Sequence, residues 1–283
     1  MKLISFDYRG TASYGAVKGD RIIDLGAHFG SAIPDLKALI AADRIFEAAG
    51  IADAESAPAV PLAAVTLLPV IPNPGKIVCV GLNYADHVQE TGRTVTESPT
   101  LFLRVAESQV AHGDDIVLPP ESGRLDYEGE IAIVIGKGGR RISEDDAWSH
   151  IAGYACYNDG SLRDWQTATP QWTAGKNFWR TGGFGPWMVT ADDIAAGQVM
   201  TLITRLNGVE MQRTTTDRLI HSIPRQIAFI STFTPLSPGD VIVTGTPGGV
   251  GAKRQPPVWM KLGDVVEVDV DAIGVLRNGI RTE

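Results

Sequence analysis

Three acidic residues at alternate positions lead into one strongly apolar stretch of this chain. Asp126, Glu128 and Glu130 are followed by five aliphatic residues, 131–135, and then by a run of glycines. An aliphatic, β-branched run that ends in glycines is typical of a buried strand. Side chains alternate between the two faces of a strand, so all three carboxylates should point the same way. Removing such a group from water without a counter-charge is costly.

Spacing alone leaves two interpretations of these carboxylates open. They bind a hard divalent cation through oxygen ligands, or they lie at a strand end that opens into solvent. A second apolar stretch, 151–157, is followed by Asn158 and Asp159, and pairing of the two strands would bring Asp159 close to Glu128 and Glu130. No basic residue stands at a suitable spacing to neutralise the three acids. Two glutamates and an aspartate with open positions suit Mg²⁺ or Mn²⁺.

The two stretches also carry ordered motifs. Asp-Tyr-Glu-Gly-Glu comes first, and Gly-Tyr-x-x-x-Asn-Asp-Gly-Ser-x-Arg-Asp-Trp-Gln follows. Together they resemble the fumarylacetoacetate hydrolase family, and the resemblance covers about residues 70–283. It implies a homodimer and the metal ligands Glu128, Glu130 and Asp159. It also implies a mixed fold, mostly β with some α, in which a rolled mixed β-sheet forms a catalytic domain over residues 71–283.

Residues 1–70 are predicted to form a small N-terminal α+β module. Alternating apolar positions indicate short strands, and Pro34 opens a helix with Phe46 on its apolar face. This part of the chain has no constellation of reactive groups, so we expect it to be structural. The expected elements are three strands, one helix and an Ala- and Pro-rich linker: 3–6, 14–17, 21–25, 34–50 and 52–61.

A short helix after residue 83 carries His87 and Glu90, with Asn83 as its expected N-cap. Residues three apart on a helix are neighbours, and a carboxylate beside an imidazole orients the ring and raises its basicity. Many exposed helices carry such a pair as surface decoration. The segment Gly-Leu-Asn-Tyr-Ala-Asp-His-Val-x-Glu is similar to the family's His/Glu dyad segment, and this implies that His87 is a general base oriented by Glu90.

The resemblance implies further contacts around the site. Gln166 would contact the substrate, Arg163 would support the metal carboxylates, and Lys176 would be a cation near the metal or a developing oxyanion. Many members of the family have a lysine followed by proline where this chain has Arg104 and Val105. The planar fork of arginine suits a carboxylate, so Arg104 is expected to help bind the substrate.

The glycine-rich stretch 245–251 is not a phosphate-binding loop, because Gly-Lys-Ser/Thr is missing at the required spacing. Glycines there can instead let backbone N–H groups approach a substrate carboxylate. The sequence Thr-Gly-Thr-Pro resembles the family pattern, which implies that Thr246 binds that carboxylate.

Composition limits the class of protein. The chain has 283 residues and a net charge of −8 without a basic tract, which argues against a nucleic-acid binder. Cys79 and Cys156 lie in apolar stretches and form no CxxC pair, which favours buried thiols in a reducing compartment. No signal peptide and no apolar run of about 18 residues is present, so we expect a cytoplasmic protein that does not enter membranes.

These features favour a metal-dependent hydrolase that cleaves a C–C bond in an acylpyruvate-like 2,4-dioxo acid. Fumarylpyruvate or a related intermediate of aromatic catabolism is the first candidate, and water activated by His87 and Glu90 would be the nucleophile. Three alternatives use the same residues: a decarboxylase of oxaloacetate-like 2-oxo diacids, an isomerase of such diacids, and a metal-binding protein that has lost turnover.

Overall fold

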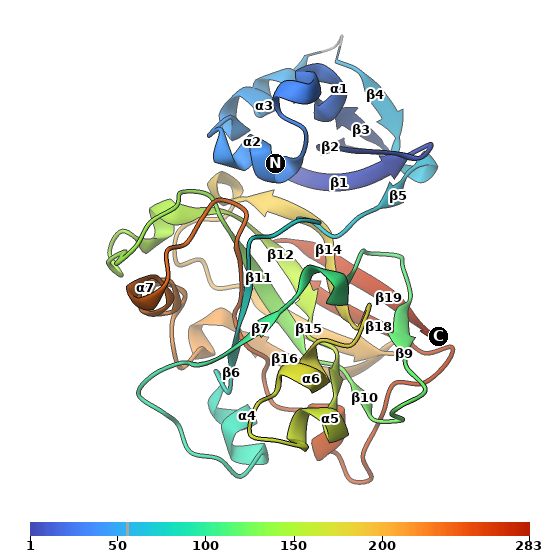
Figure 1. Ribbon diagram of the computed structural model, residues 1–283, viewed down its shortest axis with the longest axis vertical. Helices are drawn as coiled ribbons and strands as arrows, with labels where there is room; N and C mark the ends of the chain where they lie inside the picture. The colour runs from blue at the N-terminus through green and yellow to red at the C-terminus, as the bar shows by residue number, and fades with distance from the viewer. Residues whose placement is uncertain (55–56) are drawn as a thin grey trace.

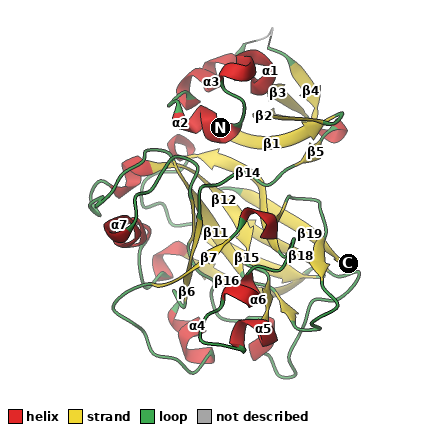
Figure 2. Cartoon of the chain, in the orientation of Figure 1, coloured by secondary structure: helices red, strands yellow, loops and turns green. Residues whose placement is uncertain are grey.

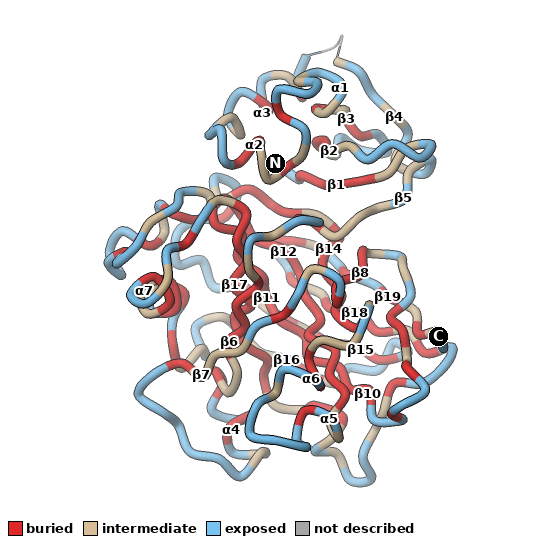
Figure 3. The backbone as a smooth tube through the Cα atoms, viewed as in Figure 1, coloured by how far each residue is buried: buried red, intermediate tan, exposed pale blue. Residues whose placement is uncertain are grey.

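The apolar run after the acidic motif forms strand β11 (Gly129–Ile135) at the centre of the fold (Figure 1). The structure is a computed structural model that describes residues 1–54 and 57–283. β11 pairs antiparallel with β12 (Ile151–Asn158) on one side and with β17 (Val241–Val243) on the other. All residues of the three strands are buried, and Figure 3 shows them as the buried centre of the molecule. The first two strands therefore lie side by side, as the sequence predicted.

These strands belong to a sheet of 12 strands. Its other members are β1 (Lys2–Tyr8), β2 (Thr11–Lys18), β3 (Arg21–Asp24), β4 (Ala59–Pro61), β5 (Thr66–Leu67), β6 (Ile77–Gly81), β7 (Thr100–Arg104), β8 (Gln109–Val110) and β14 (Gly182–Thr190). The order is β4-β3-β2-β1-β14-β12-β11-β17-β6-β7, with β5 paired to β1 and β8 paired to β14. β14 was not expected, because its glycines and proline interrupt the pattern typical of a strand.

A second sheet of five strands packs against the first. It contains β9 (Ile116–Leu118), β15 (Thr201–Leu206), β16 (Val209–Thr215), β18 (Val265–Val270) and β19 (Gly274–Thr282). Ile131 of the large sheet and Val268 of the small sheet share one buried apolar cluster. The hairpin of β15 and β16 turns at Asn207 and Gly208, both with positive φ, and this dipeptide is typical of such turns. The mixed, mostly β fold is confirmed.

The N-terminal module continues the large sheet. β1 pairs antiparallel with β14, with Leu3 opposite Met188, and both residues belong to one buried cluster that also contains Ala132 of β11. The three predicted strands at the N-terminus are confirmed. The division at residue 70 remains a prediction, because the module and the rest of the chain share a sheet and part of the core.

The predicted helix over 34–50 is wrong in its extent. Two helices occupy this region, α2 (Leu36–Ala41) and α3 (Ile45–Asp53), and Asp43 between them has a φ of 55°. Phe46 is 91% exposed, so it does not lie on the buried face as expected. The expected linker over 52–61 also contains a strand, β4, and its residues 55–56 lie outside the described residues.

The remaining helices are short, except for α7. Figure 2 shows α4, α5 and α6 together at one end of the strands, away from the N-terminal module. No helix among the described residues is long and apolar enough to cross a membrane. The bounds of the remaining helices are α1 (Leu25–Phe29), α4 (Ala85–Glu90), α5 (Arg163–Thr167), α6 (Thr173–Lys176) and α7 (Ile223–Phe233).

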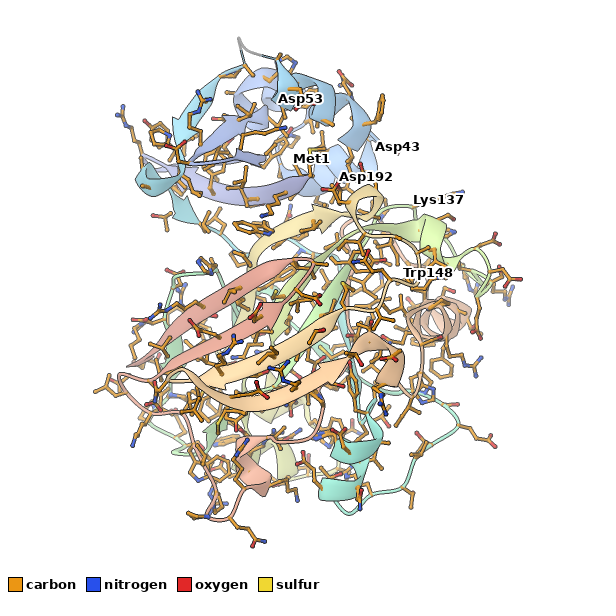
Figure 4. All side chains as sticks on the ribbon, turned by 180° about the vertical axis from the view of Figure 1, so that it is seen from behind. Met1, Asp43, Asp53, Lys137, Trp148 and Asp192 are labelled. Carbon is orange, nitrogen blue, oxygen red and sulfur yellow. The ribbon has the colours of Figure 1, made fainter. Side chains whose placement is uncertain are left out.

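A hollow of about 650 Å³ lies at the junction between the N-terminal module and the strands below it. Met1, Asp43, Lys137 and Asp192 are among its lining residues, and Figure 4 shows them from behind. The hollow has no cluster of catalytic or metal-binding groups among its lining residues, so it is a feature of the module junction.

Because the module and the rest of the chain share a core, we expect them to unfold in one transition. Replacing Leu3 with alanine should lower the free energy of unfolding by about 2–5 kcal/mol, because Leu3 is fully buried between the two parts of the chain. Urea unfolding followed by circular dichroism should keep a single transition. Phe46→Ala is the control and should change stability by less than about 0.5 kcal/mol, since that side chain is exposed. Two separate transitions would show that the module folds on its own.

Candidate active site

Three buried carboxylates meet where β11 and β12 pair. Glu128, Glu130 and Asp159 each offer an oxygen atom, and these atoms all lie within 4.8 Å of one another. The backbone holds them there, because the N–H of Asp159 donates to the carbonyl of Glu128 (2.8 Å) and the N–H of Glu128 donates to the side-chain oxygen of Asn158 (3.0 Å). The structure thus brings together the three acids that the sequence singled out as ligands. We call these three residues the acidic trio.

Asp126 does not join the acidic trio, although alternation predicted that it would. It lies on β10 (Leu125–Asp126), a separate short strand that pairs with β13 (Ser161–Leu162), and β11 begins only at Gly129. Its carboxylate accepts hydrogen bonds from the backbone N–H groups of Gly251 (2.8 Å) and Ala252 (2.9 Å). It also pairs with Arg163 (2.7 Å). Asp126 is therefore a structural link between three segments.

Cationic side chains neutralise much of the acidic trio, which corrects the expectation from spacing that it lacks basic partners and agrees with the positions that the resemblance implied for Arg163 and Lys176. Lys176 Nζ lies 2.7 Å from a Glu128 oxygen and 2.6 Å from an Asp159 oxygen. Arg163 Nη1 pairs with Glu128 (2.6 Å), and Arg104 Nη1 pairs with Asp159 (2.5 Å). These cations lie 17 to 55 residues from their partners along the chain, so local spacing could not indicate them.

Glu130 differs from its neighbours in charge balance. Burial raises the pKa of Glu130 well above its usual range, and the charges of Asp159 and Glu128 raise it further. Burial also favours a raised pKa for Glu128, but the charges of Lys176 and Arg163 outweigh it and hold that pKa low. Among the described residues, Glu130 has no cationic side chain within ion-pair distance.

The donor set fits a hard divalent cation. Three carboxylate oxygens within reach of one centre are the ligands that Mg²⁺ and Mn²⁺ prefer. A cation there would also compensate the one carboxylate that lacks a cationic partner. Four buried carboxylates face three cationic side chains in this region: Asp126, Glu128, Glu130 and Asp159 against Arg104, Arg163 and Lys176.

His87 and Glu90 form the predicted dyad on α4. His87 Nδ1 lies 2.7 Å from Glu90 Oε1, and Glu90 Oε2 accepts a hydrogen bond from the backbone N–H of Gly249 (2.9 Å). Both oxygens of Glu90 therefore act as acceptors, which assigns the ring proton to Nδ1. His87 is 6% exposed and lines a cavity, so Nε2 is the ring nitrogen left for proton exchange with a bound molecule.

Asn83 does not cap this helix as expected. Tyr84 occupies the N-cap position. The Asn83 side chain instead donates to the carbonyls of Thr244 (2.7 Å) and His221 (3.1 Å) and accepts from the N–H of His221 (2.7 Å). These bonds tie the start of α4 to the end of β17 and to the start of α7, and so fix the position of the dyad.

The glycine-rich segment 245–251 binds the protein's own carboxylates through its backbone. The N–H of Gly245 donates to Glu130 (2.5 Å), and the N–H groups of Gly249 and Gly251 donate to Glu90 and Asp126. Gly245 and Gly249 have φ values of 109° and 100°, which favour glycine. These three N–H groups are therefore occupied by carboxylates of the protein, and the approach of this segment's backbone to a substrate carboxylate remains a prediction.

A cavity of about 420 Å³ opens beside the dyad and the acidic trio. Most of the predicted site residues line it: His87, Glu128, Glu130, Gln166, Lys176 and Thr246. Gln166 also accepts a hydrogen bond from Arg163 (2.9 Å). The hydroxyl of Thr246 donates to the carbonyl of Gly129 (3.0 Å) and accepts from Gln212 (2.8 Å), so its expected role towards a substrate carboxylate remains a prediction.

Arg104 does not line this cavity, which corrects the expectation that it binds the substrate. Its guanidinium is buried and donates to Asp159, to the carbonyl of Gly160 (3.0 Å) and to the hydroxyls of Thr181 (2.9 Å) and Ser108 (3.2 Å). The guanidinium of Arg104 therefore holds Asp159 in place.

Sequence reasoning missed several residues that line the cavity. Trp172 and Phe102 are in edge-to-face contact (5.6 Å between ring centroids) and form part of the wall. In a sequence, isolated basic residues on exposed segments cannot be told apart from ordinary surface residues. No spacing rule identifies them as cavity-lining residues. The missed basic residues are Arg93, Arg124 and Lys253.

Comparisons with known proteins agree with this arrangement. Residues 76–281 match the family model described as "Fumarylacetoacetate (FAA) hydrolase C-terminal". The mitochondrial oxaloacetate tautomerase FAHD2A of Bos taurus is 41% identical over 225 residues, which cover 79% of this chain and 72% of that protein. The human oxaloacetate tautomerase FAHD2A has the same identity and coverage.

Solved structures show the same fold over the whole chain. The fumarylacetoacetate hydrolase of Exiguobacterium antarcticum is 32% identical with a TM-score of 0.89, and the match covers 100% of both chains. The maleylpyruvate hydrolase of Sphingobium sp. SYK-6, solved with manganese(II) and pyruvate, is 30% identical with a TM-score of 0.82, and covers 100% of this chain and 99% of that one. This chain belongs to the fumarylacetoacetate hydrolase family.

Proposed function

We propose that this protein is a metal-dependent isomerase that interconverts the enol and keto forms of an oxaloacetate-like 2-oxo diacid. The observation that carries the proposal is the 41% identity with oxaloacetate tautomerases. The sequence motifs favoured a C–C hydrolase, with the isomerase as an alternative. The similarity to tautomerases supports the isomerase better.

Tautomerisation needs a proton to leave one atom of the substrate and return at another. A divalent cation held by Glu128, Glu130 and Asp159 would polarise the 2-oxo group and so acidify the carbon beside it. His87 then acts as the base that takes a proton from that carbon and returns one to the enol oxygen. Glu90 keeps the proton on Nδ1 and stabilises the imidazolium while His87 carries the extra proton.

Lys176 is the second group of this chain that serves the reaction. Its ammonium is buried against Glu128 and Asp159, and it also lines the cavity. The charges of these two carboxylates outweigh burial and raise its pKa, so it stays cationic. In this position it stabilises negative charge that develops on an enolate oxygen.

The direct test follows the enol absorbance of oxaloacetate after the keto form is mixed with enzyme and Mn²⁺. Catalysed approach to the same keto–enol equilibrium, lost in excess chelator, is the expected result. Catalysis that is unchanged by the chelator would reject the metal-dependent isomerase. The absence of any acceleration in the presence of Mn²⁺ would favour a decarboxylase or a metal-binding protein without turnover.

Hydrolysis of an acylpyruvate is the second candidate. It is supported by the similarity to a maleylpyruvate hydrolase that was solved with manganese(II) and pyruvate. In this reaction His87 would take a proton from water, and the activated water would attack the distal carbonyl. Fumarylpyruvate turned over in ¹⁸O-water distinguishes the two reactions, because hydrolysis places label in the released fumarate and tautomerisation cleaves no C–C bond.

The homodimer implied by the family resemblance also remains a proposal. Light scattering on the purified chain would measure its mass in solution. A mass of about twice 30.2 kDa is expected.

Replacing Glu130 with glutamine should remove metal binding at little cost to the metal-free fold. The amide keeps an oxygen for the N–H of Gly245 and replaces a buried carboxyl group that has no cationic partner among the described residues. In the wild type, Mn²⁺ at about a hundred times its Kd should add about 2.7 kcal/mol of stability. Glu130→Gln should lose this gain and the activity together. Glu121→Gln, an exposed control, should keep both.

Replacing His87 with asparagine separates the base from the metal site. Activity should fall by about 10²–10⁴-fold, the range for a lost general base. The rise in melting temperature with Mn²⁺ should remain, because His87 is not one of the acidic trio. Glu90→Gln should lose less activity, since Glu90 acts through His87. If His87→Asn abolished the Mn²⁺ effect on melting, the assignment of the dyad would be wrong.

A further inference from the structure

Three basic side chains line the cavity outside the dyad and the acidic trio: Arg93, Arg124 and Lys253. They are exposed, unlike the buried Lys176. In the part of the chain that the structure describes, none of the three has a carboxylate within ion-pair distance, whereas Lys176 has two. The chain as a whole has a net charge of −8. Unpaired cations at one cavity in an acidic protein therefore indicate an anionic ligand.

Two of these residues lie on segments that meet at one buried carboxylate, Asp126. Arg124 stands two residues before Asp126, and its carbonyl accepts a hydrogen bond from the N–H of Arg163 (3.1 Å). Lys253 ends a 3₁₀ turn (Gly251–Lys253), and Gly251 and Ala252 of that turn donate their N–H groups to Asp126. Asp126 thus fixes both segments beside the cavity. It is a positioning residue for Arg124 and Lys253.

Arg93 is held differently. Its guanidinium carbon lies 5.2 Å from the centroid of the Trp172 ring. This cation–π contact places Arg93 against the aromatic wall of the cavity. Arg124 and Lys253 have no such contact with an aromatic ring among the described residues, and they lie on two segments that meet at Asp126.

We propose that Arg124 and Lys253 bind the second carboxylate of a diacid substrate whose 2-oxo end lies at the acidic trio and His87. This inference rests on the proposed function. It assigns the recognition of the second carboxylate of the substrate to two residues. Arginine offers a planar fork that matches a carboxylate, and lysine adds a point charge. The pair makes the site select 2-oxo diacids over 2-oxo monoacids.

Binding of a matched pair of ligands tests the proposal. 2-Oxopentanedioate and 2-oxopentanoate have the same length and differ by one terminal carboxylate. Calorimetric titration of the full chain with Mn²⁺ present should give a Kd about tenfold or more lower for the diacid, as expected for charge-assisted hydrogen bonds. Raising the salt concentration should reduce this preference, because the two cations are exposed.

Arg124→Gln and Lys253→Gln should each reduce the diacid preference several-fold, and the double variant should abolish it. The Kd for the monoacid should stay within about twofold, since the 2-oxo end binds elsewhere. Lys261→Gln is the matched control. It removes one exposed positive charge that does not line the cavity, and it should keep the full preference.

The result also separates this proposal from the proposed function, because ligand binding needs no turnover. Equal binding of both ligands by the wild type, an unchanged preference in the double variant, or equal weakening of both ligands would each overturn the assignment of Arg124 and Lys253. A preference that collapses in the double variant supports the assignment even if the wild type fails to tautomerise oxaloacetate, and that failure would reject the proposed function alone.

Discussion

The active site depends on the burial of four carboxylates in one region of the fold, which are Asp126, Glu128, Glu130 and Asp159. Burying an uncompensated carboxylate costs several kcal/mol, so each needs a cation, a donated hydrogen bond or a proton. The fold supplies Arg104, Arg163 and Lys176 from β7, α5 and the end of α6. Glu130 receives only a backbone hydrogen bond from the described residues. This imbalance leaves room for a divalent cation at the point where the substrate cavity begins.

The glycine-rich segment after β17 connects the parts of the site. Its backbone N–H groups reach a member of the acidic trio, the carboxylate of the dyad and Asp126, which supports the cationic side of the cavity. Glycine is required where φ is strongly positive and where a Cβ would clash, as at Gly251, whose Cβ would lie 2.0 Å from the carbonyl oxygen of Val258. The backbone of one segment therefore sets the relative positions of metal site, base and cavity wall.

Sequence reasoning succeeded where the signal was local. Apolar runs identified β11 and β12, and the family's His/Glu segment identified the dyad of His87 and Glu90. It failed where partners are far apart in the chain. The pairing of Arg104 with Asp159 and the role of Asp126 depend on how distant segments pack, and β14 has glycines and a proline that hide its strand.

The cavity has a floor of buried residues and a rim of exposed residues, and the two groups have different chemical roles. The acidic trio, His87 and Lys176 can polarise a 2-oxo group and move a proton, and both tautomerisation and hydrolysis need these steps. Family motifs fall on these residues, so motifs alone identify the shared chemistry and leave the reaction open. Arg124 and Lys253 lie outside the quoted motifs and carry charges that no residue of the described chain neutralises within ion-pair distance. The proposed preference for a diacid is therefore assigned to the rim, apart from the buried charges that serve the chemistry.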